Sequence, residues 1–150
     1  MSMSFIGPSG SFERRWIVYA MLRDNVQHHL EGGTPTEEFG ALHRLGDAMW
    51  TGKVSVPALA LRAELSKAAE LLARPIADLA VSIRTRAVCT YTLNRPDERG
   101  TVLARLMEWE VPYPLLDAAT LDDAFGSLHA ELMRITEGAT PTDVVEVLDS

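Results

Sequence analysis

Apolar residues at helical spacing, set between residues that start and end helices, place the strongest constraint on what this chain can fold into. One apolar stripe follows Ser11, a good helix cap, and ends at the glycine pair of residues 32–33. Segments 34–52, 55–74 and 120–138 each begin at serine or threonine, and each ends at glycine or before proline. We therefore expect helices in these four segments.

The stretch from residue 76 to residue 93 fits two secondary structures. As a helix, its apolar residues from Ile76 to Tyr91 share one face, and as a strand, residues 81–93 alternate between apolar and polar. The β-branched content favours the strand, but no other segment shows comparable alternation that could supply a partner. We expect a mostly α-helical bundle of about five to seven helices. The alternative is an α+β fold with a strand at 81–93.

A short repeat predicts a further helix near the C-terminus. The sequence EGGTPTE at 31–37 recurs as EGATPTD at 137–143. In both copies glycine precedes threonine and proline, which is typical of one helix ending and another beginning. We therefore expect a short helix at 143–148 despite its valines. We attribute the repeat to the shared need to end one helix and begin another, rather than to duplication.

Length and composition favour one domain that does not contact a membrane. A chain of 150 residues fits a single domain, in which we expect 1–10 to form an irregular arm. The N-terminus lacks the features of a signal peptide, and the longest apolar run, 16–22, is too short to span a membrane. The single cysteine, Cys89, fits a reducing compartment. These features predict a cytoplasmic location.

The acidic residues are concentrated in the last third of the chain. The net charge is −7, and residues 101–150 contain two basic and ten acidic residues. Asp122 and Asp123 have a local use at a helix start, but the shortage of Lys and Arg predicts a surface that attracts a basic protein and repels nucleic acid. The residues that we expect to face this partner are Glu108, Glu110, Asp117, Asp122, Asp123 and Glu131.

Arg84 and Arg86 form the centre of a basic cluster in this acidic chain. Guanidinium groups bind phosphate or carboxylate through paired hydrogen bonds, so both residues are candidates for anion binding. They could instead pair with the acidic last third. We favour this internal role, because opposite charges within one domain can meet at little cost.

Four residues could form a metal site. His28 and Glu31 share one helix face, and His43 and Asp47 share a face of the next expected helix. If the helices pack antiparallel, these side chains could meet and bind a metal. However, no HExxH motif is present, and histidines in a last helical turn also interact favourably with the helix dipole. We therefore expect a role at the helix end, with no metal and no cofactor.

No catalytic motif is recognisable in the sequence. It contains no P-loop, no dinucleotide-binding glycine pattern and no complete GxSxG motif around Ser9. We expect a non-catalytic protein-binding domain, such as a toxin-neutralising (immunity or antitoxin-like) protein or a secretion chaperone. The alternative is a small helical metal-dependent enzyme or ligand-binding bundle that uses His28, Glu31, His43 and Asp47.

Overall fold

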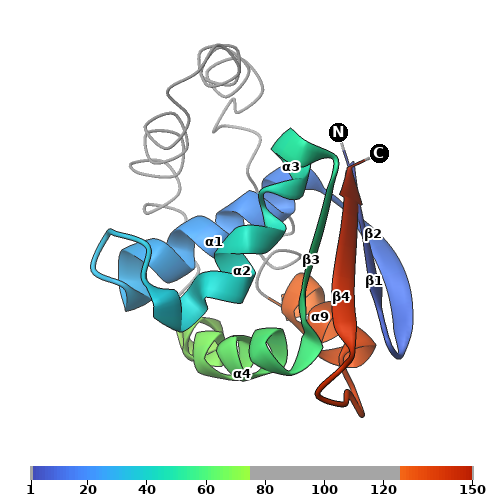
Figure 1. Cartoon of the computed structure of the whole chain (residues 1–150). Helices are drawn as coiled ribbons and strands as arrows, with labels where there is room; N and C mark the ends of the chain where they lie inside the picture. The colour runs from blue at the N-terminus through green and yellow to red at the C-terminus, as the bar shows by residue number, and fades with distance from the viewer. Residues whose placement is uncertain (1, 75–125, 150) are drawn as a thin grey trace.

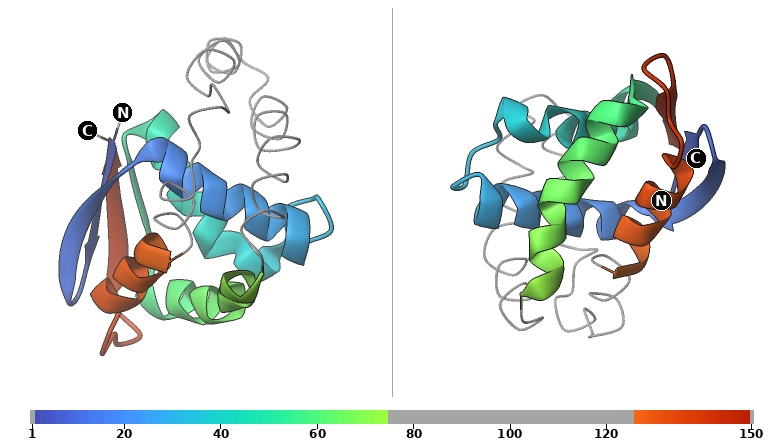
Figure 2. Two further views of the ribbon diagram at one scale, coloured as in Figure 1. Left: turned by 180° about the vertical axis from the view of Figure 1, so that it is seen from behind. Right: turned by 90° about the horizontal axis from the view of Figure 1, so that it is seen from below.

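The computed structural model describes residues 2–74 and 126–149, which form an α+β fold (Figure 1). An antiparallel sheet with strand order β2-β1-β4-β3 packs its inner face against the helices. The helices labelled in Figure 1 all lie on this one side of the sheet, as the further views in Figure 2 also show. The strands are β1 (Ser2–Gly7), β2 (Gly10–Arg15), β3 (Lys53–Pro57) and β4 (Val144–Asp149). The helices are α1 (Trp16–Leu30), η1 (Glu37–Phe39), α2 (Gly40–Leu45), α3 (Ala48–Thr51), α4 (Ala58–Ala68), η2 (Ala69–Ala73) and α9 (Leu128–Ile135).

The expected bundle of five to seven helices is wrong, because a four-stranded sheet forms one layer of the described fold. The alternative named the α+β class but put its strand at 81–93, which lies outside the described residues. The strands come instead from four other segments, each five or six residues long. A strand of this length carries only two or three inward side chains, so its alternation is easily missed.

The N-terminal hairpin replaces both the irregular arm and the start of the first expected helix. Met3 and Phe5 of β1 are fully buried, and Pro8 and Ser9 form the turn into β2. Phe12 pairs with Phe5 across the hairpin, and the two rings stack with centroids 4.9 Å apart. Phe12 also lies at helical spacing from Trp16, which is why the sequence suggested that the helix began earlier than it does.

Strand β4 corrects the expected helix at 143–148. Val145 and Val147 alternate with polar or exposed neighbours, and both are fully buried on the inner face of the sheet. β-branched side chains suit this pleated, half-buried setting. β4 also has partners on both sides, since it pairs with β1 and with β3. These partner strands lie more than eighty residues earlier in the chain, so the residues near 143–148 could not indicate that the segment pairs with them.

The core lies between the inner face of the sheet and the helices. α1 crosses the middle of this layer, and its side chains Tyr19, Leu22 and Val26 are fully or almost fully buried. Tyr19 donates a hydrogen bond to the backbone oxygen of Leu42, which ties α1 to α2. The largest fully buried side chains are Tyr19, Phe5, Phe39, Met3, Leu22, Leu42, Leu45, Leu61, Leu65 and Leu71.

In residues 2–74 and 126–149, no helix has the length and apolar character needed to cross a membrane.

The hairpin turn contacts the C-terminal end of α9. The N–H of Ser9 donates to the oxygen of Ile135 at 3.0 Å, and Ser9 Oγ donates to the oxygen of Glu137 at 2.5 Å. Gly7 makes this approach possible, because a Cβ atom at this position would overlap the backbone of Ile135.

We expect the Gly7→Ala substitution to lower the free energy of unfolding by about 1–3 kcal/mol, because the backbone of Ile135 must shift to admit the methyl group. Gly40→Ala is the matched control, since no atom lies within 4 Å of the added Cβ and the residue is helical. The control should leave stability unchanged or raise it by up to about 1 kcal/mol. Urea denaturation measures both. Equal effects of the two substitutions would contradict the proposed contact.

Candidate functional site

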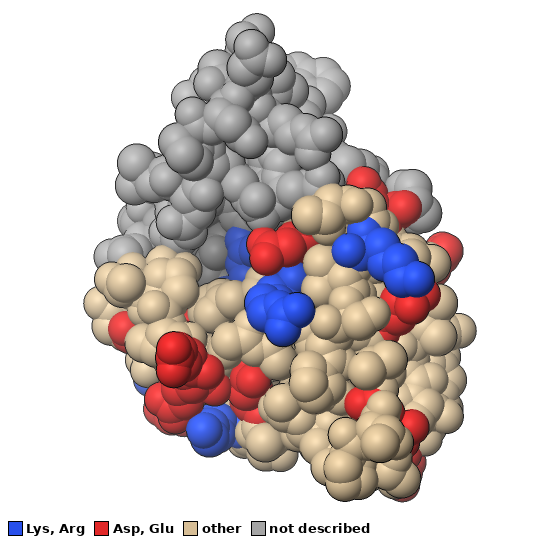
Figure 3. Space-filling model, in the orientation of Figure 1, with Lys and Arg blue, Asp and Glu red and all other residues tan. Residues whose placement is uncertain are grey.

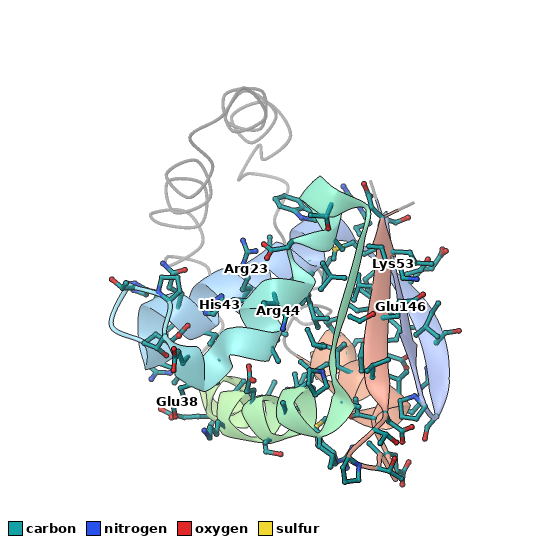
Figure 4. The ribbon with its side chains drawn as sticks, in the orientation of Figure 1. Arg23, Glu38, His43, Arg44, Lys53 and Glu146 are labelled. Atoms are coloured by element: carbon teal, nitrogen blue, oxygen red, sulfur yellow. The ribbon has the colours of Figure 1, made fainter. Side chains whose placement is uncertain are left out.

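A buried polar cluster surrounds α2 where α1 ends (Figure 4). Its centre is the carboxylate of Glu31, whose side chain is fully buried at the C-terminus of α1. Oε1 lies 2.5 Å from Nε2 of His43 on α2, and Oε2 accepts hydrogen bonds from the N–H and the hydroxyl of Thr36 at 2.5 and 2.6 Å. One carboxylate therefore joins the end of α1, the loop after it and α2.

His43 is shielded from water by this packing. Burial lowers the pKa of His43 below its ordinary value and outweighs the hydrogen bond and charge of Glu31, which act in the opposite direction. The positive charge of Arg23 also lowers the pKa, and Asp47 raises it. A lowered pKa makes the imidazole neutral at pH 7, so it is the Nε2–H tautomer that donates to Glu31.

Glu64 of α4 contributes a second buried carboxylate to the cluster. Its two oxygens accept hydrogen bonds from the backbone N–H groups of Ala41 and Leu42 at 3.1 and 2.9 Å. These groups are among the first of α2 and have no partner within the helix, so Glu64 acts as a cap supplied by another helix. Burial raises the pKa of Glu64, and the two N–H groups partly oppose this shift.

Arg23 of α1 closes the cluster on a further side. Its side chain is buried and lies beside α2, close to His43 (Figure 4). A Cβ atom at Gly46 would collide with the guanidinium, so this glycine makes room for the arginine. Arg23, Glu31, His43 and Glu64 thus place one guanidinium and two carboxyl groups around the neutral imidazole.

The cluster brings together two of the four residues considered for a metal site. Glu31 and His43 are in contact, whereas His28 packs edge-on against His29. Among the described residues, no group of three or more His, Cys, Asp or Glu side chains is arranged to hold a metal ion. His28 and His29 do lie in the last turn of α1, where the sequence placed them. The cluster is built as a connector between helices, with its carboxylates already bonded to protein groups.

The remaining candidate residues lie elsewhere. Glu131 is on α9 and forms an ion pair with Arg134 at 2.7 Å, which lowers the pKa of Glu131. The other candidates for the acidic surface and the anion site lie outside the described residues: Glu108, Glu110, Asp117, Asp122, Asp123, Arg84 and Arg86. His129 is buried, with Nε2 at 2.8 Å from the oxygen of Leu65.

Sequence reasoning did not identify Glu64 or Arg23 as candidate site residues. A signal for Glu64 was present, since Leu61, Glu64, Leu65 and Ala68 occupy the positions i, i+3, i+4 and i+7 of one helix face. A carboxylate in the middle of an apolar face is expected to have a buried hydrogen-bond partner. Arg23 carried no comparable signal.

Comparisons with protein-family models, curated proteins and solved structures find no match to this chain.

We expect the stability of the wild type to depend on the titration of His43. Because the pKa of His43 is lowered in the folded state, the unfolded chain takes up the proton first as the pH falls. The free energy of unfolding is therefore highest, with respect to this group, above the unfolded pKa of about 6.5, and it decreases as the pH falls below that value. His43→Gln keeps a hydrogen-bond donor without titrating. The stability advantage of the wild type over this variant should therefore shrink between pH 7.5 and 5.5, by up to about 1.4 kcal/mol per pH unit.

Urea denaturation of both proteins at each pH measures this difference. An advantage that grows on acidification would show that the charge of Glu31, rather than burial, controls the imidazole.

Removal of the carboxylate of Glu64 should destabilise the fold. Glu64→Ala leaves the N–H groups of Ala41 and Leu42 without their acceptor in a buried setting, so we expect a loss of about 2–4 kcal/mol. Glu64→Gln retains one acceptor oxygen and should lose at most about half as much. Thermal and urea unfolding of the two variants provide the test, and equal losses would contradict the capping role.

Proposed function

We propose that the protein is a non-catalytic protein-binding domain whose acidic surface near the C-terminus docks onto a basic protein. A cationic toxin held inactive, or a basic protein held for secretion, would suit this chemistry. The observation that carries the proposal is the separation of charge along the chain. Residues 1–100 are almost balanced, with twelve basic and eleven acidic residues, whereas 101–150 contain two and ten.

The described part of this acidic region retains negative charge after its internal pairs are formed. Residues 126–149 contain five acidic residues and one arginine, Arg134, which pairs with Glu131. Glu146 pairs with Lys53 of β3 at 3.2 Å. Within the described residues, no ion pair is found for Glu137, Asp143 or Asp149. Pairing therefore removes two of the five charges and leaves the others available to attract a cation.

Part of this charge is presented on an exposed connection. Residues 136–143 link α9 to β4 at the lower end of the sheet (Figure 1), and Glu137 is exposed there. In the space-filling view, acidic atoms but no Lys or Arg atoms lie around this lower right edge (Figure 3). An uncompensated negative potential increases the rate of encounter with a cationic partner and the salt sensitivity of binding.

The polar cluster around α2 supports a binding role rather than a catalytic one. Glu31 already accepts three hydrogen bonds from Thr36 and His43, and Glu64 accepts two from α2. Both carboxylates are thus engaged in holding the fold, which leaves the surface charge as the feature that requires an explanation beyond stability.

Affinity purification with charge-matched variants tests this proposal. One variant neutralises Asp117, Asp122, Asp123 and Glu137 to their amides, and the control neutralises Glu13, Glu37, Glu38 and Glu70, so that both lose four charges. The tagged wild type should enrich a basic protein from an extract of its native host, as quantified by mass spectrometry. The first variant should lose that protein and the control should retain it. Binding of the purified pair should weaken steeply with added salt.

Equal retention by the two variants, or loss from both, would reject the C-terminal surface as the docking site. Enrichment of a neutral or acidic partner whose binding does not depend on salt would reject the electrostatic basis of the proposal.

A further inference from the structure

β2 is one free edge of the sheet, and its outward backbone groups face no other strand in the described fold. The register pairs Gly7 with Gly10 across the two-residue turn. In a hairpin closed by such a turn, the flanking residues form a hydrogen-bonded pair, and the direction of the backbone groups alternates along the strand. Ser11 and Glu13 therefore direct their backbone N–H and C=O groups away from β1.

Two guanidinium groups occupy the outward carbonyl oxygens. Nη2 of Arg134 donates to the oxygen of Ser11 at 3.3 Å, and Nη1 of Arg14 donates to the oxygen of Glu13 at 2.9 Å. The same Nη2 of Arg134 lies 2.7 Å from Glu131, so the ion pair on α9 anchors the guanidinium beside the strand. A Cβ atom at Gly10 would lie 2.6 Å from Nη1 of Arg134, which shows how closely the arginine approaches β2.

The other free edge is less suited to strand pairing. β3 ends at Pro57, which has no N–H to donate, and α2 packs beside β3. Nη2 of Arg44 on α2 also reaches the oxygen of Ser55 at 3.4 Å. β2 contains no proline, although α9 and α1 pack against it as α2 packs against β3. Among the described residues, Arg134 and Arg14 are the groups that bond the outward carbonyl oxygens of β2.

β2 is complementary to a second copy of itself. In an antiparallel pairing centred on Phe12, the two Phe12 residues would lie opposite each other on the inner face, where each ring stacks on Phe5 and has the guanidinium of Arg14 5.4 Å from its centroid. Ser11 then lies opposite Glu13 of the second copy, and Gly10 opposite Arg14. No like charges are opposed in this register. The backbone bonds of the Ser11–Glu13 pairs would use the two carbonyl oxygens that the arginines now occupy.

We propose that β2 is a strand-pairing surface for a second copy of this chain and that Arg134, anchored by Glu131, keeps it closed. Protection of an edge by charged side chains is a general means of preventing unwanted strand addition. Here the protecting group is the long, half-exposed side chain of Arg134. When this side chain is removed or moves away, the outward backbone groups of β2 become accessible to another strand. This proposal does not require the acidic docking surface to exist, although Glu131 was also assigned to that surface.

The primary test is the dimer dissociation constant measured by sedimentation equilibrium. Arg134→Ala should dimerise at least about tenfold more tightly than the wild type, because a competing hydrogen bond is lost from the edge. Arg74→Ala is the matched control, since it removes one arginine from another exposed ion pair, with Glu70, that does not touch a strand. The control should behave as the wild type does.

Two variants at Glu13 then locate the interface in the Arg134→Ala background. Glu13→Pro removes an outward N–H that the pairing needs and should abolish the dimer. Glu13→Ala removes the same charge but keeps the N–H, so it should leave the dimer intact. Glu13 and Arg134 are both exposed. Circular dichroism checks that each variant is folded.

A dimer no tighter than that of the wild type, or one that survives Glu13→Pro, overturns the proposal. If Arg134→Ala fails to fold, Glu131→Gln serves as the second variant, because it releases the anchor and retains the arginine. It should strengthen dimerisation by a smaller factor, and no change in the dissociation constant would equally overturn the proposal.

Discussion

The described fold depends on the pairing of β4 with both β1 and β3. β4 is the central strand that joins the N-terminal hairpin to β3, so a sheet of four strands exists only when residues 144–149 are in place. A hairpin alone is marginal in water, and its inward side chains Met3 and Phe5 need the rest of the layer to be buried. β4 therefore completes the surface on which α1, α4 and α9 pack. This arrangement places the two chain ends side by side (Figure 1).

The polar interior around α2 results from the shortness of the helices that meet there. α2 is six residues long and α3 is four, so most of their backbone N–H and C=O groups are terminal and have no partner within the helix. Glu64 supplies acceptors at the start of α2, and Glu31 fixes the loop that leads to it. Buried carboxylates are costly unless they are bonded, and here the bonds that offset this cost are the ones that hold the short helices in position.

The repeated sequence shows what local patterns could and could not predict. In both copies the first glycine has a positive φ, 70° at Gly32 and 69° at Gly138, and ends a helix as expected. The segments after the two copies differ, because the first copy leads into a short 3-10 turn and α2, whereas the second leads into β4. The helix-ending residues are a local signal and were interpreted correctly. The state of the next segment depended on its valines and on strands distant in sequence, so the repeat was a poor guide to it.

Similar limits applied to the candidate site. The proximity of Glu31 and His43 followed from the assumption that two consecutive helices pack together, and the structure places these side chains in contact. Whether that contact is a ligand set or an internal bond depends on the other acceptors and donors nearby. Thr36 satisfies the second oxygen of Glu31, and nothing in the local pattern indicates that its hydroxyl turns inward. Residue spacing can thus predict which side chains lie close together, but it does not show which of them already have hydrogen-bond partners.

Arg134 connects the two surfaces for which functions are proposed. By pairing with Glu131 it lowers the negative charge of α9, and by reaching Ser11 it covers the edge of β2. A cationic partner that drew Glu131 away would weaken the anchor of Arg134, and an anion that bound Arg134 would release both Glu131 and the strand. Arg134 is the single Lys or Arg residue among 126–149. The same side chain therefore offsets part of the negative charge of this region and covers the free edge of β2. The Glu131–Arg134 pair is thus common to the two proposed surfaces, although each proposal can be tested without the other.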